Sequence, residues 1–568
     1  MWPRPQFFAD ARLNFAENLL YPPSNPAQDS VAVIEANEIS KNRVSWYELR
    51  ERVRQCSNAM LSIGIGEKDR VVGFVANHCN TLVAMLSTTC IGAIWSAVSP
   101  DNGVHAVLER LVQVEPKLLF ADNAVMYNGK VHELSGKIRE LVRQMPQLQR
   151  CVVFEAGFTT AEEPSSPLEQ SEKMCSYAQF VQVVSLDSPL RFEQFAPDHP
   201  IYILFSSGTT GKPKCIVHGA IGTLLQHKKE HDIQCSMRPG DTLFYFTTCM
   251  WMMWHWLVSA LASGVRIVIY DGSPFRPLDE SGVGDLAMPK LIEELGVTHF
   301  GTSAKYLSTL EQKHIAANRL TDLSNLQAVY STGSPLAPST FEYTYKYFGP
   351  DINLASITGG TDIISLFGAP SQISPVYAGE VQVRGLGMAV EAWDTEGRCV
   401  KDEPGDLVCI RPFPSQPVMF WGAKGQETYE NSYFRRFANI WHHGDFIQIN
   451  ADTGGLKMLG RSDGVLKPAG VRFGSSEIYN VLLRRFPEVE DGLCVGQRRE
   501  HDTDETVVLF VKMVNGSSFS SRLRDQIRSA IRNDLSARHV PGIIDSAPEI
   551  PLTVNGKKFV FRNPLVGG

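Results

Sequence analysis

Short apolar runs alternate with helical segments from Val71 to Tyr330, and this alternation constrains the fold more than any other feature of the chain. Val71–Val75 and Ala93–Val98 have the composition of buried strands, and Leu82–Cys90 between them is expected to be a helix. Further strands are expected at 118–121, 151–154, 201–205, 265–270, 297–300 and 326–330, and further helices at 131–145 and 288–295. Because strand–helix–strand order favours parallel sheets, we predict an α/β fold with a large N-terminal domain of doubly wound sheets.

The character of the chain changes after Tyr377 and again after residue 460. Short strands such as Glu380–Val383 and Asp406–Ile410, separated by Gly/Pro turns, favour a small antiparallel barrel or sheet. The last part of the sequence predicts helices at 476–486 and 521–535 and a strand at 507–513. We therefore predict three parts: a large domain over 1–460, a β-rich subdomain within it over 379–460, and a small α+β C-terminal domain over 461–568. The polar segment from 155 to about 200 is expected to be a surface insertion or a long connector.

Two uncharged stretches, Thr81–Pro100 and Thr242–Val265, are long enough to cross a membrane on length alone. Both contain many Thr, Ser and Gly residues, and neither has basic flanks arranged as a topology signal. A doubly wound sheet buries its central strands on both faces. We therefore expect both stretches to be buried core and predict no membrane span.

Composition restricts the class of partner and the compartment. The net charge is −7 and no long basic run is present, which argues against a nucleic-acid-binding surface. The eleven cysteines are scattered without a Cys-x-x-Cys pair, as is typical of a reducing compartment. Met1–Asp10 lacks the apolar core of a secretory signal, so we expect the protein to be cytosolic.

A loop rich in glycine, hydroxyl groups and lysine leaves the apolar run Ile201–Phe205. Residues 206–214 read Ser-Ser-Gly-Thr-Thr-Gly-Lys-Pro-Lys. Such a loop can surround a phosphate with backbone N–H groups, hydroxyl donors and a lysine charge. It is not a Walker A sequence, because Pro213 stands where that motif needs Ser or Thr. Taken alone, the loop is explained equally well as a polar turn.

Other motifs follow the loop in a fixed order: Ser356–Asp362 (SITGGTD), Trp441–Asp445 (WHHGD), Gly460–Gly464 (GRSDG) and Pro551–Lys557 (PLTVNGK). Together with the loop they resemble the adenylate-forming superfamily, which holds acyl-CoA synthetases, peptide-synthetase adenylation domains and luciferases. This order across more than half of the chain is far more specific than any single motif.

One branch of the superfamily matches more closely than the others. Ser331–Leu336 (STGSPL) and Arg472–Ile478 (RFGSSEI) both resemble the acetoacetyl-CoA synthetases. The resemblance extends from about Leu13 to Lys558. Members usually begin well before the segment that matches Phe8–Leu20, so a shortened and catalytically impaired form is one alternative.

The resemblance implies a reaction in two steps. The carboxylate of an acid, acetoacetate in this branch, attacks the α-phosphate of ATP and gives an acyl-adenylate and pyrophosphate. The thiol of CoA then displaces AMP. Both steps concentrate negative charge around a phosphate, so cations and fixed hydrogen-bond donors are the expected catalytic groups. ATP, CoA and Mg²⁺ are the implied co-substrates and cofactor.

The resemblance also assigns nucleotide contacts by motif. The β- and γ-phosphates would contact the loop through Ser206, Ser207, Gly208, Thr209, Thr210, Gly211, Lys212 and Lys214. Thr361 would meet the α-phosphate, and Asp362, where most members have glutamate, would help to hold Mg²⁺. Asp445 would accept the ribose hydroxyls. The other implied contacts are the adenine with Gly333, Ser334 and Pro335, the ribose with Arg461, and the phosphate with Arg472.

Lys557 is the implied catalytic lysine of the first step, acting with Thr361 and Arg472. Asp463 is the implied hinge about which the small domain turns between the two steps.

After that turn the Gly470 loop would serve CoA, and Arg532 aligns loosely with a contact to CoA. Trp251 and Met252 are candidates for the acyl pocket, although core packing explains them equally well. Acetyl-CoA synthetases have a tryptophan at the position of Gly359, and its absence would leave room for a longer acid.

Alternatives remain at this stage. His227–His231 (HKKEH) matches a zinc-protease pattern, although its helix is expected to be polar and solvated. Gly460–Gly464 matches the Gly-x-Ser-x-Gly hydrolase elbow, but Pro468 and Gly470 disfavour the helix that an elbow must open. Other possibilities are an acetate or butyrate synthetase, an adenylation module, or a binding protein that retains nucleotide affinity without turnover.

Overall fold

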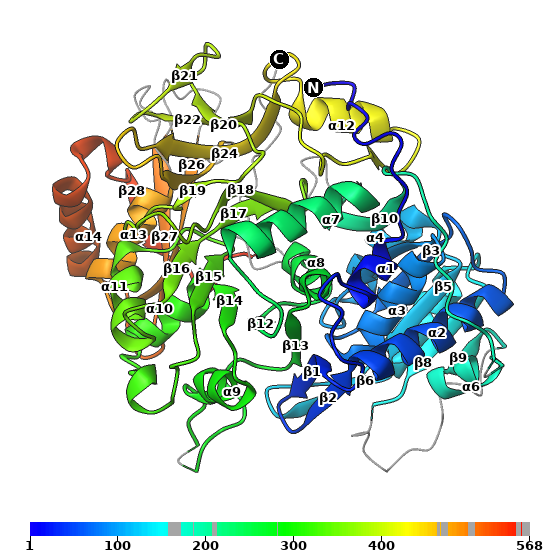
Figure 1. Cartoon of the computed structure of the whole chain (residues 1–568). Coiled ribbons are helices and arrows are strands. Elements are labelled where there is room, and N and C mark those ends of the chain that lie inside the picture. Colours follow the sequence, from blue (N-terminus) through cyan, green and yellow to red (C-terminus); the bar gives the residue numbers. More distant parts are fainter. Residues whose placement is uncertain are drawn as a thin grey trace.

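The computed structural model describes residues 1–156, 172–185, 187–206, 213–280, 282–462, 466, 475–497, 506–552 and 558. Two large sheets form most of the molecule, and helices cover their faces (Figure 1). The α/β fold with doubly wound sheets that the sequence predicts is therefore confirmed.

The eight-stranded sheet is parallel from β10 to β9, and β11 and β23 extend it in antiparallel pairings. Its strands are, in spatial order, β23 (Met419–Phe420), β11 (Lys214–Gly219), β10 (Pro200–Ser206), β4 (Ile94–Val98), β3 (Arg70–Phe74), β5 (Leu118–Asp122), β8 (Arg150–Phe154) and β9 (Met174–Ser176). The central strands β3, β4 and β5 are buried along almost their whole length and are mainly apolar, as a sheet covered on both faces requires.

The seven-stranded sheet is parallel except for β2, which pairs antiparallel with β1. Its strands are β16 (Asn353–Ser356), β15 (Ala328–Thr332), β14 (His299–Ser303), β12 (Thr242–Tyr245), β13 (Arg266–Asp271), β1 (Val31–Asn37) and β2 (Lys41–Ser45). The helices of this part of the chain are α1 (Phe15–Leu20), α2 (Trp46–Ser62), α3 (Cys79–Cys90), α4 (Val104–Val114), α5 (Ser135–Gln144), α6 (Tyr177–Gln182), α7 (Ala220–Lys229), α8 (Met252–Ser259), α9 (Ala287–Leu295), α10 (Ala304–Gln312) and α11 (Pro338–Tyr347).

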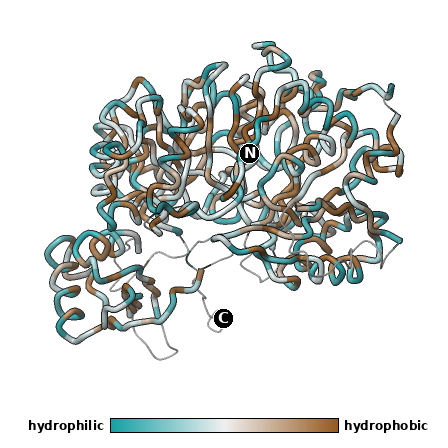
Figure 2. The backbone as a smooth tube through the Cα atoms, turned by 90° about the horizontal axis from the view of Figure 1, so that it is seen from below, coloured by the Kyte–Doolittle hydropathy of each residue, from teal (hydrophilic) through white to brown (hydrophobic). Residues whose placement is uncertain are grey.

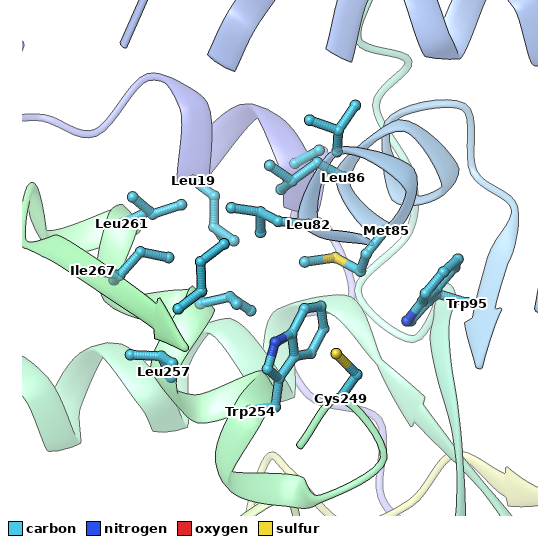
Figure 3. Close-up of a cluster of buried hydrophobic side chains, with 14 of the residues drawn as sticks. Leu19, Leu82, Met85, Leu86, Trp95, Cys249, Trp254, Leu257, Leu261 and Ile267 are labelled. Atoms are coloured by element: carbon cyan, nitrogen blue, oxygen red, sulfur yellow. The ribbon is translucent and has the colours of Figure 1, made fainter. Parts of the chain in front are cut away.

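The largest hydrophobic core joins α1, α2, α3 and α8 to the two sheets. Figure 3 shows Leu82 and Met85 of α3 facing Trp254 and Leu257 of α8. The two uncharged stretches supply a large share of this core, because they form α3 with β4 and β12 with α8. Their expected role as buried core is confirmed, and none of the described helices is both long and apolar enough to traverse a bilayer.

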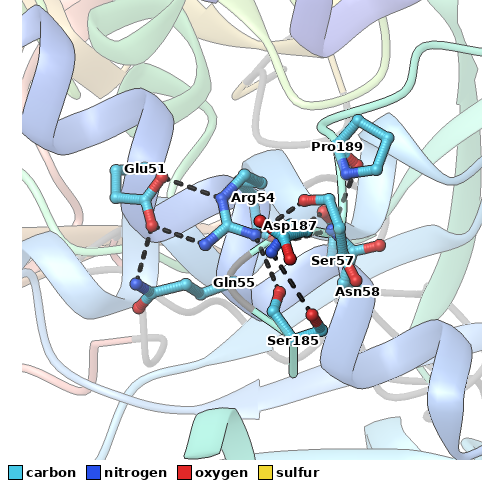
Figure 4. A network of polar contacts seen from close by, with 9 residues as sticks. Glu51, Arg54, Gln55, Ser57, Asn58, Ser185, Asp187 and Pro189 are labelled. Carbon is cyan, nitrogen blue, oxygen red and sulfur yellow. Dashed lines mark hydrogen bonds and ion pairs between the residues drawn. The ribbon is translucent and has the colours of Figure 1, made fainter.

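A network of polar contacts fixes the segment after α6 to the outer face of α2 (Figure 4). Arg54 pairs with Glu51 on its own helix and donates hydrogen bonds to the carbonyls of Ser185 and Ser188. Asn58, one turn further along α2, donates to the carbonyl of Pro189 at 3.2 Å. The expected connector is therefore anchored where the structure describes it.

Three expectations about elements need correction. The helix expected at 131–145 begins only at Ser135, because Lys130–Glu133 is β7, which pairs with β6 (Ala124–Tyr127). The expected connector contains β9 and α6, and β9 extends the parallel sheet. The strand expected at 380–383 is reduced to β19 (Val383–Arg384), since the chain from 378 to 380 turns instead.

The antiparallel region predicted after Tyr377 is present as small sheets. The five-stranded sheet has the order β21 (Cys399–Val400), β20 (Val390–Trp393), β22 (Pro404–Cys409), β24 (Trp441–Ile449) and β25 (Leu456–Arg461). The three-stranded sheet consists of β17 (Thr358–Gly360), β18 (Ser365–Ala369) and β19, and α12 (Gly425–Tyr433) packs against β23 and β24.

The C-terminal elements enclose a hydrophobic cluster of their own. They are α13 (Ser475–Arg485), β26 (Val489–Gln497), β27 (Thr506–Met513), α14 (Ser521–Asp534) and β28 (Ile543–Ser546). In Figure 2 a smaller group of elements lies apart from the main body, at the lower left. The boundary predicted at 460/461 falls within β25, just before its last residue, Arg461, and stays a prediction.

Candidate functional site

The glycine-rich loop connects two antiparallel strands. Ser206 pairs with Lys214 in the register of β10 and β11, so these two residues stand at the base of the loop. Lys214 Nζ lies 5.6 Å from the ring centre of Tyr433 and 6.0 Å from that of Phe420, an arrangement in which aromatic faces favour a cation. Residues 207–212, which carry most of the expected phosphate contacts, lie outside the described residues.

Asp362 supplies a negative charge just after β17. Its Oδ1 accepts a hydrogen bond from the hydroxyl of Tyr433. Burial raises the pKa of this carboxyl, but His443 and Lys214 oppose that effect, and Tyr433 and Arg461 add to them. The pKa of Asp362 therefore lies below its ordinary value, and the group is ionised at neutral pH.

Asp445 and Arg461 form an ion pair across β24 and β25. The two residues are register partners, and Arg461 Nη1 donates to Asp445 Oδ1 at 3.0 Å. Oδ2 of the same carboxylate is 3.7 Å from His443 Nε2. Because His443 also acts on Asp362, the motifs around residues 362 and 445 meet at this imidazole. Ser462 Oγ donates to the carbonyl of Asp445, so the serine of the hydrolase-elbow alternative serves here as a hydrogen-bond donor.

The segment Gly333–Pro335 follows directly on β15. Gly333 has φ +91°, a conformation that favours glycine, and Ser334 is exposed. β15 is parallel to β16, and Thr332 Oγ1 donates to the carbonyl of Ile357 just beyond β16. Gly333–Pro335 and the motif that contains Thr361 therefore leave the same edge of the sheet, where ligands of open α/β sheets bind.

Gly359 lies where β17 and β18 approach each other most closely. A Cβ at this position would be 2.0 Å from the carbonyl oxygen of Ser365 and 2.9 Å from the Cα of Leu366. The hairpin itself therefore requires glycine, which is a sufficient reason for the missing side chain. Trp251 caps the N-terminus of α8 and Met252 is its first residue, but the two pack into different hydrophobic clusters. The role of these two residues and Gly359 in an acyl pocket stays a prediction.

Several predicted residues cannot be compared with the structure. Lys557, Arg472, Gly470 and Asp463 lie outside the described residues. Arg532 is described and lies exposed on α14.

Lys558, the neighbour of Lys557 in sequence, belongs to the C-terminal part. Its Nζ is 2.7 Å from Asp491 Oδ1 and 3.6 Å from the ring centre of Tyr479, and its backbone bridges to Leu552. The residue that follows the implied catalytic lysine is thus tied to β26 and α13.

The zinc-protease pattern does not form a metal site. His227 and Glu230 are fully buried, as is His231, so the expectation of a solvated helix is wrong. His227 Nδ1 lies 2.9 Å from Ser259 Oγ, and Glu230 accepts a hydrogen bond from Trp256 Nε1 at 2.9 Å. Within the part of the chain that the structure describes, no group of three or more acidic, His or Cys side chains could hold a metal ion.

Two residues near the site were not anticipated from the sequence. Tyr433 is the last residue of α12, and its ring is stacked on Trp441. His218 in β11 is fully buried near the backbone of Thr361, and burial lowers its pKa to about 3, which keeps the ring neutral. Neither residue belongs to a recognised motif, although Tyr433 stands shortly before the motif Trp441–Asp445.

Comparison with known proteins identifies the family. The model of the AMP-binding enzyme family matches residues 24–415. The chain belongs to the AMP-binding enzyme family. The matched range includes the glycine-rich loop, Gly333–Pro335 and Asp362, and the motif at Asp445 follows it.

Relatives of this AMP-binding enzyme align along nearly the whole chain. Malonamoyl-CoA synthetase of Penicillium aethiopicum is 54% identical over an alignment of 584 positions, which covers 100% of this chain and 79% of the relative. Acetoacetyl-CoA synthetase of Mus musculus is 46% identical over 557 residues, 98% of this chain and 81% of the relative. A solved structure, acetoacetyl-CoA synthetase from Streptomyces lividans, has a TM-score of 0.90 at 35% identity and covers 98% of this chain and 82% of that one. The predicted resemblance is confirmed.

Proposed function

We propose that this AMP-binding enzyme is an AMP-forming acid–CoA ligase and that acetoacetate is its acid substrate. The observation that carries the proposal is the alignment with acetoacetyl-CoA synthetases, which extends over 98% of the chain at 46% identity. The two phrases Ser331–Leu336 and Arg472–Ile478 point to the same branch. The scattered free cysteines are consistent with a cytosolic enzyme.

In the first step, the site residues would hold ATP by its phosphates and its ribose. Lys214 supplies a positive charge at the base of the loop, and Thr361 supplies a hydroxyl for the α-phosphate. Asp445 is fixed by Arg461 at 3.0 Å, and its carboxylate can accept the two ribose hydroxyls. Gly333–Pro335 would lie against adenine, at the sheet edge where the other groups meet.

The residues present fit a magnesium ion that is bound together with the nucleotide. Asp362 is ionised, and an oxygen ligand of this kind suits a hard cation. No all-protein cage of ligands exists among the described side chains, and Mg²⁺ in nucleotide enzymes is usually held by one or two carboxylates plus substrate phosphates. When bound, the ion would offset phosphate charge. Asp362 would orient it, and Lys214 would add a second positive charge.

We place the small domain at 461–568, with its hinge at Asp463. Lys557 would approach the acid and the α-phosphate in the first step, and Arg472 would contact the phosphate. After rotation about the hinge, the Gly470 loop and Arg532 would face CoA. The separate hydrophobic cluster of α13, α14 and β26–β28 supports a unit that can move as one body.

Malonamate is a second candidate substrate, because the malonamoyl-CoA synthetase is 54% identical to this chain. Acetoacetate and malonamate both have a carbonyl group at C3 and differ only in a terminal methyl or amino group. A methyl group needs an apolar contact, whereas an amide NH₂ group needs hydrogen-bond acceptors. The choice between the two acids therefore depends on the polarity of a small region at the end of the acyl pocket.

The test is pyrophosphate release from the purified protein with acetoacetate, malonamate, acetate or butyrate, each with and without CoA. We expect release with acetoacetate, and formation of AMP and thioester only when CoA is added. A strong preference for malonamate would make malonamate the substrate in place of acetoacetate. A preference for acetate or butyrate, which have no carbonyl group at C3, would contradict both candidates. Absence of release with all four acids would contradict the proposed function.

A further inference from the structure

Tyr433 is held in one position beside the site. It is 3% exposed, and its ring centre lies 3.7 Å from that of Trp441 with an interplanar angle of 13°. The ring of Phe420 packs nearly perpendicular to it, with 5.8 Å between the ring centres. With the ring fixed on two sides, the hydroxyl has one direction to donate, and that direction is Oδ1 of Asp362.

The hydrogen bond makes the two carboxylate oxygens of Asp362 unequal. Oδ1 is engaged by the phenol, whereas Oδ2 lies on the side of Gly360 and His443. Lys214 Nζ lies 5.6 Å from the same phenol ring, so the loop lysine and the aspartate both lie close to this phenol. Among the described residues the phenol engages Oδ1, so Oδ2 is the oxygen that they leave for a ligand.

We propose that Tyr433 is a positioning residue for the activation step: its hydroxyl fixes Asp362 so that Oδ2 faces the divalent cation that accompanies ATP. This inference rests on the proposed function, in which Asp362 holds that cation. Because Asp362 has a short side chain, the direction of Oδ2 depends on how the carboxylate is held, and the hydrogen bond from Tyr433 holds it.

Electrostatics agree with this geometry. The hydrogen bond from Tyr433 is one of the contributions that hold the pKa of Asp362 below its ordinary value. Burial and the neighbouring aspartate raise the pKa of Tyr433 well above its ordinary value, so the phenol keeps its proton. The pair is therefore a donor and an ionised acceptor at neutral pH, and donation to a charged acceptor is the stronger kind of hydrogen bond.

The test compares Tyr433→Phe with the wild-type protein by electron paramagnetic resonance of Mn²⁺ in the presence of a non-hydrolysable ATP analogue. The variant keeps the stacked ring and loses only the hydroxyl. We expect the dissociation constant of Mn²⁺ in the ternary complex to rise about tenfold or more, as for other groups that orient a metal ligand. The concentration of Mg²⁺ that gives half-maximal pyrophosphate release should rise in parallel.

Tyr429→Phe is the matched control. Tyr429 lies one turn earlier on α12, is 1% exposed and has its hydroxyl near the side chain of Gln416. Loss of this hydroxyl should leave Mn²⁺ affinity unchanged, although it removes the same atom from the same helix. Equal weakening by both variants would mean a general effect on packing and would overturn the proposal.

Asp362→Asn separates the inference from the function on which it rests. If Asp362→Asn weakens Mn²⁺ binding but Tyr433→Phe does not, Tyr433 has no positioning role and the proposed function stands. If Asp362→Asn has no effect either, the proposed role of Asp362 fails as well. In the double variant we expect the same affinity as in Asp362→Asn alone, because the hydroxyl then has no carboxylate to orient; a further loss would contradict the mechanism.

Discussion

At the scale of single residues, the charges of the candidate site are already neutralised or held before a nucleotide binds. Arg461 pairs with Asp445, and Tyr433 donates to Asp362. Side chains fixed in this way need no reorganisation when phosphate charge develops, which is where preorganised sites gain their advantage. Removing one member of a pair should therefore affect nucleotide binding more than folding.

Asp445→Asn tests the ribose assignment. The amide has the shape of the carboxylate but lacks its charge and can present an NH₂ group to Arg461. A hydrogen bond to a charged group contributes about 1.5–3 kcal/mol, so we expect the KM for ATP to rise roughly tenfold or more, with a smaller effect on KM for CoA. Initial-rate kinetics with each co-substrate varied in turn would measure both constants.

The control is Asp452→Asn, an exposed aspartate in the turn between β24 and β25. It should leave both constants unchanged. An unaltered KM for ATP in the Asp445 variant would remove this residue from the nucleotide site.

A partly buried ion pair outside the site should make stability depend on pH. His78 Nε2 lies 2.8 Å from Asp122 Oδ1. Burial lowers the pKa of His78, but Asp122 outweighs that effect, with Glu35 and Asp271 adding to it, and the pKa rises from 6.5 to about 9. The raised pKa means that the pair stabilises the fold fully below pH 6.5, and this contribution is lost as the pH rises through about 9.

We therefore expect the temperature of thermal unfolding to fall between pH 6.5 and pH 9, and His78→Gln to reduce that fall. Scanning calorimetry at both pH values would measure the difference. His105→Gln is the control, because His105 is largely exposed. An identical pH dependence in wild type and His78→Gln would show that the pair does not contribute in this range.

The residues that could be predicted from the sequence are those that belong to contiguous motifs. Asp362 and Asp445 were assigned from their neighbours in sequence, and the structure brings both to His443. Tyr433 could not be predicted, because its contact with Asp362 depends on how α12 packs and not on local sequence. The opposite error occurred at His227–His231, where a local pattern suggested exposed charges and tertiary packing buried them.

At the scale of elements, β3, β4, β5, β8, β10, β13, β14 and β15 were predictable because they are continuous apolar runs bounded by turns. The other strands of the two large sheets, β1, β2, β9, β11, β12, β16 and β23, were not predicted. The order of strands within each sheet was not predictable, since it depends on crossovers between distant segments. The hairpin of β10 and β11 illustrates the limit. The apolar run before the loop indicated a strand, but its pairing with Lys214–Gly219 is a tertiary property.

Gly359→Ala tests the tight approach of β17 and β18. The new Cβ would lie 2.0 Å from the carbonyl oxygen of Ser365, and a backbone atom cannot move aside as the end of a flexible side chain can. We expect a loss of about 2 kcal/mol or more in the free energy of unfolding, in the range of overpacked positions. Denaturant unfolding followed by Trp fluorescence would measure it.

Gly360→Ala is the matched control in the same hairpin, because a Cβ there would meet only ordinary contacts, at 3.5 Å from His443 Nε2 or farther. Equal stability of the two variants would show that the hairpin can open. The result also bears on Gly359→Trp, which would introduce the tryptophan that acetyl-CoA synthetases have at this position. A change in acid preference in that variant is meaningful only if the hairpin tolerates a side chain.

At the scale of the whole molecule, the proposed reaction needs two arrangements of the large domain and the C-terminal part. The described elements of that part share one hydrophobic cluster, and Lys558 is tied to Asp491 within it. The implied catalytic lysine, Lys557, should therefore move with the C-terminal part as a unit. Substitutions can separate the two steps if each arrangement serves only one of them.

Lys557→Ala should abolish the first step, because a lysine charge between the carboxylate and the α-phosphate would be lost. We expect adenylate formation to fall by at least about a hundredfold, the lower end of what loss of one charge-stabilising donor costs. Thioester formation from a supplied acyl-adenylate and CoA should remain close to wild type. Equal loss of both steps would contradict the assigned role.

Asp463→Pro should give the reverse result. Proline fixes φ near −65°, so the chain at the hinge could no longer change conformation between the steps. Adenylate formation, measured as acid-dependent exchange of pyrophosphate into ATP, should persist, whereas thioester formation from the supplied acyl-adenylate should fall. Lys557→Ala and Asp463→Pro should thus fail in opposite steps. The step that each variant retains shows that it is folded, so its lost step is not explained by unfolding. A hinge variant that retains both steps would mean that one arrangement of the two parts serves the whole reaction, and the division at residues 460 and 461 would lose its functional meaning.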